Sequence, residues 1–371
     1  MVGTPFQVRL DRFRRLMMEH EVDAFLVAVP ENRFYLSGYG EEDRYLTESS
    51  GYLLISLQRQ LLLTDPRYEE AAKIQAPDFD PLIYRKGLAE LLAEVFSDLQ
   101  IKVLGVEGHY LTYQQYKEVE EALRSSRPGS RIVFPDALVE SLRVIKEPCE
   151  IDLIRASLDV TEKVLNEIWQ RLQPGMTETN LAWEIESSIR TKGAQAVSFP
   201  PIVAGGPNAA LPHAVPTRRP IAEGETLVLD LGSKLDHYCS DITRTWIWGK
   251  PDAWVREIYR IVREAQLAAQ TSIRDGANSV EVDGVARKII ENAGYGPNFG
   301  HGLGHGVGLA VHEKPGIRKQ DPTILRENMV ITVEPGIYLP GCGGVRLENM
   351  VRVTSNGCEV LNETSLFYEF S

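Results

Sequence analysis

The chain has 371 residues, of which 43% are hydrophobic, and it carries a formal net charge of −12 at pH 7. This length exceeds the size at which one hydrophobic core usually keeps growing, so two domains are expected. The negative charge argues against binding nucleic acid or an anionic membrane through bulk electrostatics and favours small neutral or cationic ligands.

The cysteines and the amino terminus bear on the cellular compartment. Cys149, Cys239, Cys342 and Cys358 form no CxxC pair and no zinc-finger cluster, so free thiols in a reducing compartment are expected. Residues 1–17 are amphipathic and basic but lack an apolar run with a cleavage site, and no segment reaches about 18 uninterrupted apolar residues. These features predict a soluble cytoplasmic protein.

Short apolar strands alternate with helical patterns in the first third of the chain, which predicts an α/β domain. The predicted strands are residues 24–29, 52–57, 60–64 and 102–106, and the predicted helix is 88–99. A polar, turn-rich stretch over residues 124–136 follows, and longer helices begin beyond it. We therefore expect an amino-terminal domain over residues 1–135, a linker over 136–150 and a second domain over 151–371.

Long helices separated by strand pairs are expected in the second domain. The helical segments are residues 150–172, 178–190, 252–274 and 280–292. The second of them follows Pro174-Gly175 and has Thr177 as a predicted N-cap, and Gly294 is expected to end the last.

Two strand-like segments of this domain are similar to each other. Residues 225–230 and 327–334 each run from a polar start through apolar residues to a carboxylate, Asp230 or Glu334. Each is followed by a turn and a second strand that bears another carboxylate, Asp241 or Glu348. An internally duplicated half-domain, in which each half supplies two carboxylates from a hairpin, would explain the pattern.

Five residues are candidate metal ligands: Asp230, Asp241, His305, Glu334 and Glu348. If they converge, the carboxylates would repel by about 4 kcal/mol per pair at 4 Å with an effective dielectric of 20, unless cations lie between them. Two divalent ions would neutralise four carboxylates, so the pattern predicts a dinuclear metal site. Taken singly, Asp230 or Asp241 fits an exposed turn equally well.

The context of the two glutamates supports this interpretation. Glu334 precedes Pro335-Gly336, which would end its strand with the glutamate at the tip. In residues 345–350, a period of two places Arg346 and Glu348 on one face, where Arg346 could pair with a ligand carboxylate. The alternative is a surface pair of little energetic value.

The segment HGLGHGVGLAVHE, residues 301–313, holds His301, His305 and His312 with four glycines among them, and a fifth, Gly300, precedes it. A single histidine is more often structural than a ligand. This density of glycine, however, predicts a backbone that is closely approached by something bound.

Together these motifs resemble the creatinase/aminopeptidase metallopeptidases of the pita-bread fold, and among them the Xaa-Pro dipeptidases (prolidases) and Xaa-Pro aminopeptidases. The matching motifs are ALPH (210–213), LVLDLG with DITRTW, HGLGHGVGLAVHE, VEPG followed by Tyr338, VRLEN, PENRFYLSGY (30–39), LLLTDPRY (61–68) and IKEPCEIDLIRAS (145–157). The resemblance covers nearly the whole chain. It implies an α+β protein with a C-terminal pita-bread (creatinase/methionine aminopeptidase-like) catalytic domain and an N-terminal α/β creatinase-like domain.

The resemblance also implies roles for the five candidate ligands. Asp230 would chelate one metal ion, Asp241 and Glu348 would bridge both ions, and His305 with Glu334 would complete the other. Glu334 would also accept a proton from the bridging water.

Further positions match residues around the substrate. His213, His301 and His312 would line the substrate pocket, with His312 stabilising the tetrahedral intermediate and His213 contacting the substrate carbonyl. Tyr338 and Arg346 match positions just behind the metal ligands.

The implied activity is that of a dinuclear-metal exopeptidase that hydrolyses Xaa-Pro bonds in dipeptides or short peptides, with a metal-bridging hydroxide as nucleophile. Oxygen ligands with one imidazole suit Mn²⁺ first, with Co²⁺ or Zn²⁺ as alternatives. The partners would be a proline-containing di- or oligopeptide and a second copy of the chain. The amino-terminal domain would serve dimerisation, and its residues 38–45 would reach the neighbouring active site or, alternatively, form a solvated acidic loop.

Several alternatives remain. Gly316 stands where many prolidases place an arginine or a bulky residue, with Arg318 two residues on, which favours an Xaa-Pro aminopeptidase acting on longer peptides. A metal-free creatinase-type hydrolase would lack the carboxylate set, and a methionine aminopeptidase would lack the large amino-terminal domain. A non-catalytic binding relative would have lost ligands.

Overall fold

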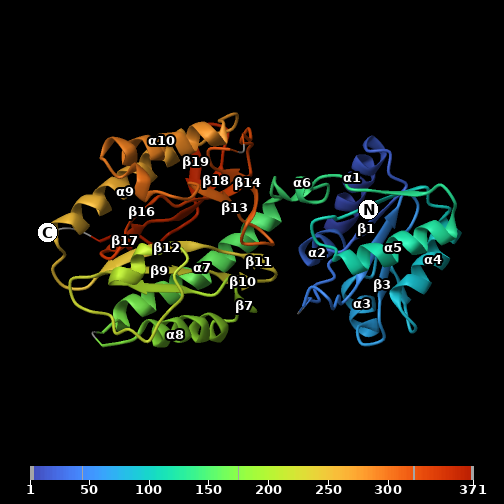
Figure 1. Cartoon of the computed structure of the whole chain (residues 1–371), viewed down its shortest axis with the longest axis horizontal. Coiled ribbons are helices and arrows are strands. Elements are labelled where there is room, and N and C mark those ends of the chain that lie inside the picture. The colour runs from blue at the N-terminus through green and yellow to red at the C-terminus, as the bar shows by residue number, and fades with distance from the viewer. Residues whose placement is uncertain (1–3, 44, 174, 321, 369–371) are drawn as a thin grey trace. The chain divides into compact units, whose positions relative to one another are not determined.

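The computed structural model describes residues 4–368 except 44, 174 and 321 (Figure 1). The chain forms two compact units, residues 1–143 and 144–371, whose boundary falls inside residues 136–150. Arg44 of the candidate loop, Pro174 of the predicted turn and the first residues of the amphipathic amino terminus lie outside the described residues.

The first unit is built on one mixed sheet. Its strands are β1 (Ala24–Val27), β2 (Tyr52–Ser56), β3 (Gln60–Thr64), β4 (Asp80–Ile83), β5 (Val103–Val106) and β6 (Arg131–Val133). They lie in the order β4-β3-β2-β1-β5-β6, with β2 antiparallel to β1 and β3 and the other pairs parallel.

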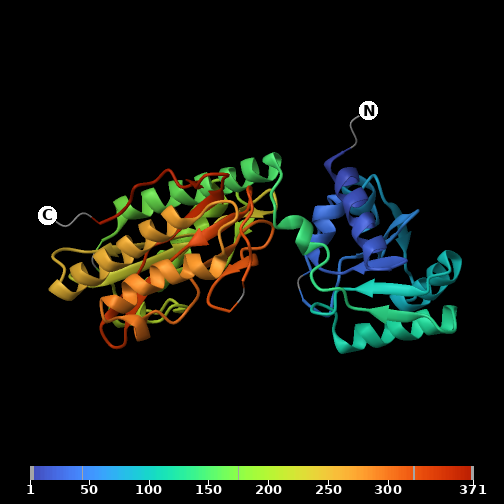
Figure 2. The ribbon, with the colours of Figure 1, turned by 90° about the horizontal axis from the view of Figure 1, so that it is seen from above.

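Helices cover both faces of this sheet. They are α1 (Pro5–Glu19), α2 (Pro30–Ser37), α3 (Glu69–Gln75), α4 (Leu88–Leu99), α5 (Tyr113–Ser126) and α6 (Glu140–Arg143). Leu26 and Leu54 pack against α4 and α5, whereas Phe25 makes an edge-to-face contact with Phe13 of α1. Figure 2 shows α1 and the α4/α5 pair on opposite faces of the sheet. Burial on both faces explains why the central strands are continuous apolar runs.

The elements predicted for this unit are confirmed, with bounds that shift by at most two residues. The turn-rich interpretation of residues 124–136 is wrong in part, because it contains the end of α5 and all of β6. β6 is a three-residue edge strand with an exposed Arg131, and so short a strand produces no recognisable alternation.

The second unit contains four long helices and several small sheets. The helices are α7 (Pro148–Arg171), α8 (Glu178–Thr191), α9 (Ala253–Ser272) and α10 (Ser279–Asn292). All four predicted helices are confirmed within two residues. Thr177 Oγ1 accepts a hydrogen bond from Asn180 N at 3.2 Å, and Gly294 takes a left-handed φ of +88° beyond α10, as expected.

The strands of this unit fall into two halves. The first half contains β7 (Ala196–Val197), β8 (Ile202–Gly205), the short 3₁₀ helix η1 (Gly206–Ala210), β9 (Thr226–Leu231), β10 (Ser233–Leu235), β11 (Tyr238–Cys239) and β12 (Ile242–Ile247). The second contains η2 (Gly296–Asn298), β13 (Gly304–Gly306), β14 (Glu313–Ile317), β15 (Val330–Val333), β16 (Gly336–Leu339), β17 (Gly343–Arg346), β18 (Asn349–Val353) and β19 (Cys358–Val360).

Each half pairs two helices with an antiparallel strand pair. Apolar residues of α7 and α8 pack on β8, β9 and β12, and those of α9 and α10 pack on β15 and β18. The helix pairs lie on opposite sides of the strands in Figure 1. β9 pairs with β12 and β15 pairs with β18, so the two predicted strand pairs are both present.

The structure also bears on the cysteines and on membrane-spanning helices. All four cysteines are free thiols. Among the residues that the structure describes, none of the helices combines the length and the apolar composition that a bilayer crossing needs.

Candidate metal centre

The five predicted ligands meet where the two antiparallel strand pairs end. Asp230 lies near the end of β9, and Asp241 immediately precedes β12. Glu334 follows β15 directly, and Glu348 immediately precedes β18. His305 is the central residue of β13, the strand next to β15.

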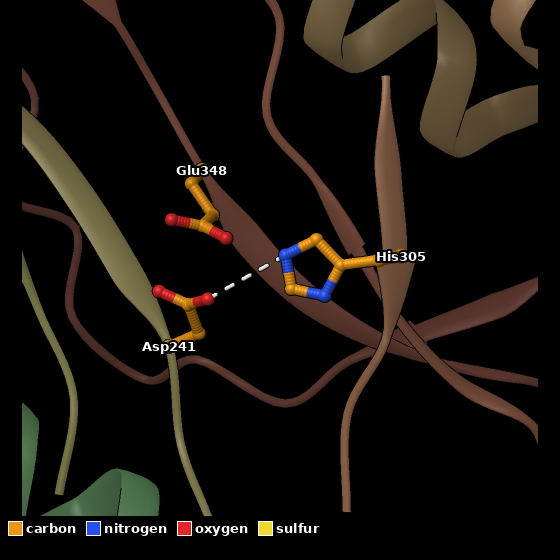
Figure 3. A group of neighbouring side chains, drawn as sticks. All are labelled: Asp241, His305 and Glu348. Carbon is orange, nitrogen blue, oxygen red and sulfur yellow. Dashed lines mark ion pairs between the residues drawn. The ribbon is translucent and has the colours of Figure 1, made fainter. Parts of the chain in front are cut away.

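The side chains of this group point toward one another. Asp241, His305 and Glu348 each offer a ligand atom, and these atoms lie within 4.8 Å of one another (Figure 3). His305 Nε2 lies 3.6 Å from Asp241 Oδ2 and 3.2 Å from Glu334 Oε1. Asp230, Asp241 and Glu348 are buried, so the alternative of an exposed turn is wrong for both aspartates.

The tautomer of His305 follows from its backbone contact. Its Nδ1 lies 3.1 Å from Gly306 O, and because a carbonyl oxygen only accepts, Nδ1 carries the proton. In the neutral ring, Nε2 then directs a lone pair at the carboxylates. A metal-ligating imidazole is held in this way, with its second nitrogen donating to the protein.

Three carboxylate oxygens in the centre lack hydrogen-bond partners among the described residues: Asp230 Oδ1, Asp241 Oδ1 and Glu348 Oε1. A buried carboxylate oxygen without a partner is costly. Oxygens of this kind beside one imidazole lone pair are the donor set that divalent ions of intermediate hardness prefer. The residues present therefore fit bound divalent metal ions.

The pKa values of the four acids and His305 reflect this crowding. Burial, followed by the charge of Glu348, raises the pKa of Asp241, and burial, followed by Glu334 and Asp230, raises that of Glu348 to about 8. Burial opposes charge on His305 and Glu334, but their contact prevails, raising the pKa of His305 and lowering that of Glu334. The centre thus favours added positive charge.

Arg346 forms an ion pair with Asp230, as expected. Its Nη2 donates to Asp230 Oδ2 at 2.5 Å, its Nη1 donates to Pro212 O at 3.1 Å and to Tyr338 Oη at 2.9 Å, and its Nε donates to Thr243 Oγ1 at 3.1 Å. With 3% exposure, Arg346 is not part of a surface pair, so that alternative is wrong.

The prediction of one continuous strand over residues 345–350 is also wrong. β17 ends at Arg346 and pairs with β16, whereas β18 begins at Asn349 and pairs with β15. Residues 343–351 are all buried, so alternation of polar and apolar residues does not report on a solvent face there. The chain changes sheets at the point where it presents Glu348.

A hydrogen-bond relay connects Arg346 to His301 through Tyr338. His301 Nδ1 lies 2.8 Å from Gly302 O and is therefore protonated, which leaves Nε2 to accept from Tyr338 Oη at 2.9 Å. Burial lowers the pKa of His301 and raises that of Tyr338 to about 12. Both shifts favour the neutral forms that the relay requires.

Two further histidines surround the centre. The ring centroids of His312 and His305 are 4.2 Å apart, with the rings nearly perpendicular at 82°. Burial, followed by the charge of His305, lowers the pKa of His312. His213 has an exposed side chain, and its charge contributes to the lowered pKa of both His301 and His312. The structure therefore brings all the predicted site residues into one region.

Comparisons with known proteins identify the family. Residues 152–355 match the model of metallopeptidase family M24, and residues 9–145 match the creatinase/prolidase N-terminal domain. The chain belongs to metallopeptidase family M24. As an M24 metallopeptidase it is a peptidase that uses divalent metal ions, and it combines a creatinase N-terminal domain with a pita-bread domain, as the sequence motifs indicated.

Similar M24 proteins match over nearly their full length. A Xaa-Pro dipeptidase of Pyrococcus furiosus is 35% identical over 96% of this chain and 98% of its own. The solved structure of a Xaa-Pro dipeptidase from Bacillus anthracis has a TM-score of 0.90 and 36% identity, covering 97% of this chain and 98% of its own. An X-Pro aminopeptidase structure from Thermotoga maritima has a TM-score of 0.84 and 35% identity, covering 95% and 98%.

Three glycines of residues 301–313 are closely approached by the protein's own backbone. A Cβ built on Gly304 would overlap Thr332 O, and one on Gly306 would overlap Lys314 O. A Cβ on Gly302 would lie 3.0 Å from Ile317 O. The M24 metallopeptidase thus uses these glycines to bring its own strands together around His305. The approach of something bound to this segment stays a prediction.

Gly304→Ala is expected to destabilise the protein by about 1–3 kcal/mol, because the added methyl must displace the backbone of β15. Gly284→Ala is the matched control. Gly284 lies inside α10, and nothing lies within 4 Å of its Cβ position, so this substitution should stabilise by about 0.5–1 kcal/mol. Urea denaturation measures both, and equal stability of the two variants would contradict the packing role.

Sequence reasoning missed two threonines that fix ligand carboxylates in the M24 centre. Thr243 Oγ1 donates to Glu348 Oε2 at 2.7 Å, and Thr332 Oγ1 donates to Glu334 Oε1 at 3.2 Å. Thr243 lies two residues after Asp241, and Thr332 lies two residues before Glu334. Because residues two apart on a strand share a face, this spacing could have indicated both.

Proposed function

We propose that this M24 metallopeptidase is a dinuclear-metal exopeptidase that hydrolyses Xaa-Pro bonds in dipeptides or short peptides. The observation that carries the proposal is the cluster of partnerless carboxylate oxygens on Asp230, Asp241 and Glu348 beside the lone pair of His305. The names of the similar proteins, Xaa-Pro dipeptidase and X-Pro aminopeptidase, supply the substrate class.

The metal ligands in this proposal are Asp230, Asp241, His305, Glu334 and Glu348. Four carboxylates with one imidazole suit Mn²⁺ first, with Co²⁺ or Zn²⁺ as alternatives. When bound, a pair of such ions lowers the pKa of water to near neutrality and polarises the scissile carbonyl.

Glu334 is assigned the proton transfers. The Glu334 side chain is 17% exposed, whereas Asp230, Asp241 and Glu348 are buried, so its carboxylate is the more accessible to substrate. An ionised carboxylate beside the substrate can accept the proton of the attacking water and pass it to the leaving proline nitrogen.

The surrounding histidines are assigned to the substrate. A neutral His312 can donate a hydrogen bond to the oxygen that becomes negative in the transition state, and His213 is assigned the contact with the substrate carbonyl. His301 lines the same pocket. Tyr338 holds His301 in place, and Arg346 holds both Tyr338 and Asp230.

Proline explains why such a pocket is needed. An Xaa-Pro bond is a tertiary amide without an N–H group, so proteases that bind an extended backbone through its N–H groups lose a contact there. A pocket shaped for the pyrrolidine ring replaces that contact.

The protein is further proposed to act as a cytoplasmic homodimer in which residues 38–45 reach the active site of the partner. Contacts of residues 41 and 43 in this loop speak against a fully solvated acidic loop. The buried Arg33 donates through Nη2 to Asp43 Oδ1 at 2.8 Å and to Glu41 O at 3.1 Å, and the Asp43 side chain is only 2% exposed.

Dipeptidase and aminopeptidase activity are separated by the length of the substrate. Purified protein with added Mn²⁺ or Co²⁺ is expected to hydrolyse Leu-Pro, and a tripeptide Xaa-Pro-Yaa tests for aminopeptidase activity on longer peptides. Arg318, which is exposed beside Gly302, is the candidate for binding the carboxylate of a dipeptide. Metal-replete protein that cleaves neither peptide would contradict the proposal. The metal-free creatinase-type and non-catalytic alternatives are not favoured, because all five ligands are present and adjacent.

A further inference from the structure

A buried carboxylate at the start of α8 is held by several donors. Glu178 is 0% exposed. Its Oε1 accepts from Gly205 N at 2.7 Å, and its Oε2 accepts from Thr217 N at 2.8 Å, from Thr217 Oγ1 at 2.7 Å and from Asn208 Nδ2 at 2.9 Å. Hydrogen bonds to an ionised carboxylate are about twice as strong as neutral ones, so this cluster is a firm anchor.

All of these donors belong to one segment, residues 205–217, which leaves β8 and carries His213. Gly205 and Thr217 are its two ends, so binding both to one carboxylate closes the segment at its base. Backbone bonds reinforce this closure, because Thr179 N donates to Thr217 O at 3.0 Å.

The remainder of the segment is held by β17, on the side of the metal centre. Arg346 Nη1 donates to Pro212 O at 3.1 Å, one residue before His213. A Cβ on Gly344 would overlap Ala209 O, so η1 packs directly against the backbone of β17. Glu178 thus fixes the two ends of the segment, and Arg346 fixes it at Pro212. Together these contacts determine the orientation of residues 205–217.

We infer that Glu178 is a positioning residue, which fixes residues 205–217 so that His213 is presented to the substrate. The inference rests on the proposed function, in which His213 contacts the substrate carbonyl. Glutamine cannot replace Glu178, because an amide has one acceptor oxygen and its NH₂ group would face either Gly205 N–H or the donors of Thr217.

A double-mutant cycle tests the inference. Glu178→Gln and His213→Ala should each lower kcat/KM for Leu-Pro by about 10²-fold at unchanged metal content, because a displaced contact costs as much as a lost one. The double variant should be no worse than His213→Ala alone, because the position of an absent ring does not matter. Hydrogen exchange, which needs no substrate, should be faster at the amides of residues 205–217 in Glu178→Gln.

Glu162→Gln is the matched control. Glu162 is also a buried carboxylate of this unit, and it accepts from Glu363 N and Thr364 N at 3.1 Å each. This variant should keep its kcat/KM and leave exchange of residues 205–217 unchanged.

Independent, multiplicative effects of Glu178→Gln and His213→Ala, or unchanged exchange in Glu178→Gln, would overturn the inference. A wild-type enzyme that cleaves no Xaa-Pro peptide while exchange still responds to Glu178→Gln would instead overturn the proposed function. If Glu178→Gln fails to fold, Asn208→Ala combined with Thr217→Val removes both side-chain donors to Glu178 and must give the same non-additivity with His213→Ala.

Discussion

Replacing Glu334 by glutamine is expected to lower kcat by about 10²–10⁴-fold, the range that a positioned acid or base contributes. The amide keeps the size of the side chain but cannot accept the proton of the attacking water. The Thr332 Oγ1 contact can persist, because the amide oxygen still accepts, so the fold of β15 should be retained. A normal kcat in this variant would refute the proton-transfer role.

Metal content must be measured beside turnover, because Glu334 is also a proposed ligand. Steady-state assays of Glu334→Gln at saturating Mn²⁺, with metal analysis of the same samples, separate loss of proton transfer from loss of an ion. Glu359→Gln is a suitable control, because Glu359 lies on β19 with a side chain 41% exposed and pairs with Arg155 on the surface. It should retain wild-type kcat and metal content.

Sequence reasoning found the ligands because each occupies a position that local rules define. Asp230 and Glu334 stand at or near the ends of apolar strands, where a turn or a proline stops the ladder. Asp241 and Glu348 immediately precede the strands that pair with these two, β12 and β18. Antiparallel pairing then brings both acids of a pair to one end. The helices were predictable for a similar reason, since their periodicity and caps are local signals.

The features that sequence reasoning missed depend on tertiary contacts. The sheet change between Arg346 and Asn349 occurs where every residue is buried, so no pattern marks it. The spacing of glycines reports a close approach but not whether a ligand or a neighbouring strand makes it. Glu178 looks like any acidic residue in the first turn of a helix, and only the fold brings residues 205–217 to it.

The metal-free protein is expected to lose stability as the pH rises from about 5 to 9. Glu348 has its folded pKa raised from 4.5 to about 8, so its contribution is fully present below pH 4.5 and is lost as the pH rises through 8. The raised pKa of Asp241 acts in the same direction. His305, raised from 6.5 to about 9, contributes below pH 6.5 and loses that contribution by pH 9. The lowered pKa of Glu334 leaves its contribution constant over this window.

Chemical denaturation of chelator-treated protein across this pH range measures how steeply the free energy of unfolding falls as the pH rises. Bound Mn²⁺ should oppose this trend, because metal ions compete with protons for the same ligands and bind more tightly at high pH. An ion at a free concentration 100 times its Kd adds about 2.7 kcal/mol to the free energy of unfolding. Because binding is tighter at high pH, the gain at a fixed Mn²⁺ concentration should be larger at pH 8 than at pH 5. Glu348→Gln removes one titrating acid and should make the metal-free slope shallower. Metal-free stability that rises with pH, or a slope that Glu348→Gln leaves unchanged, would mean that these acids do not share one buried centre.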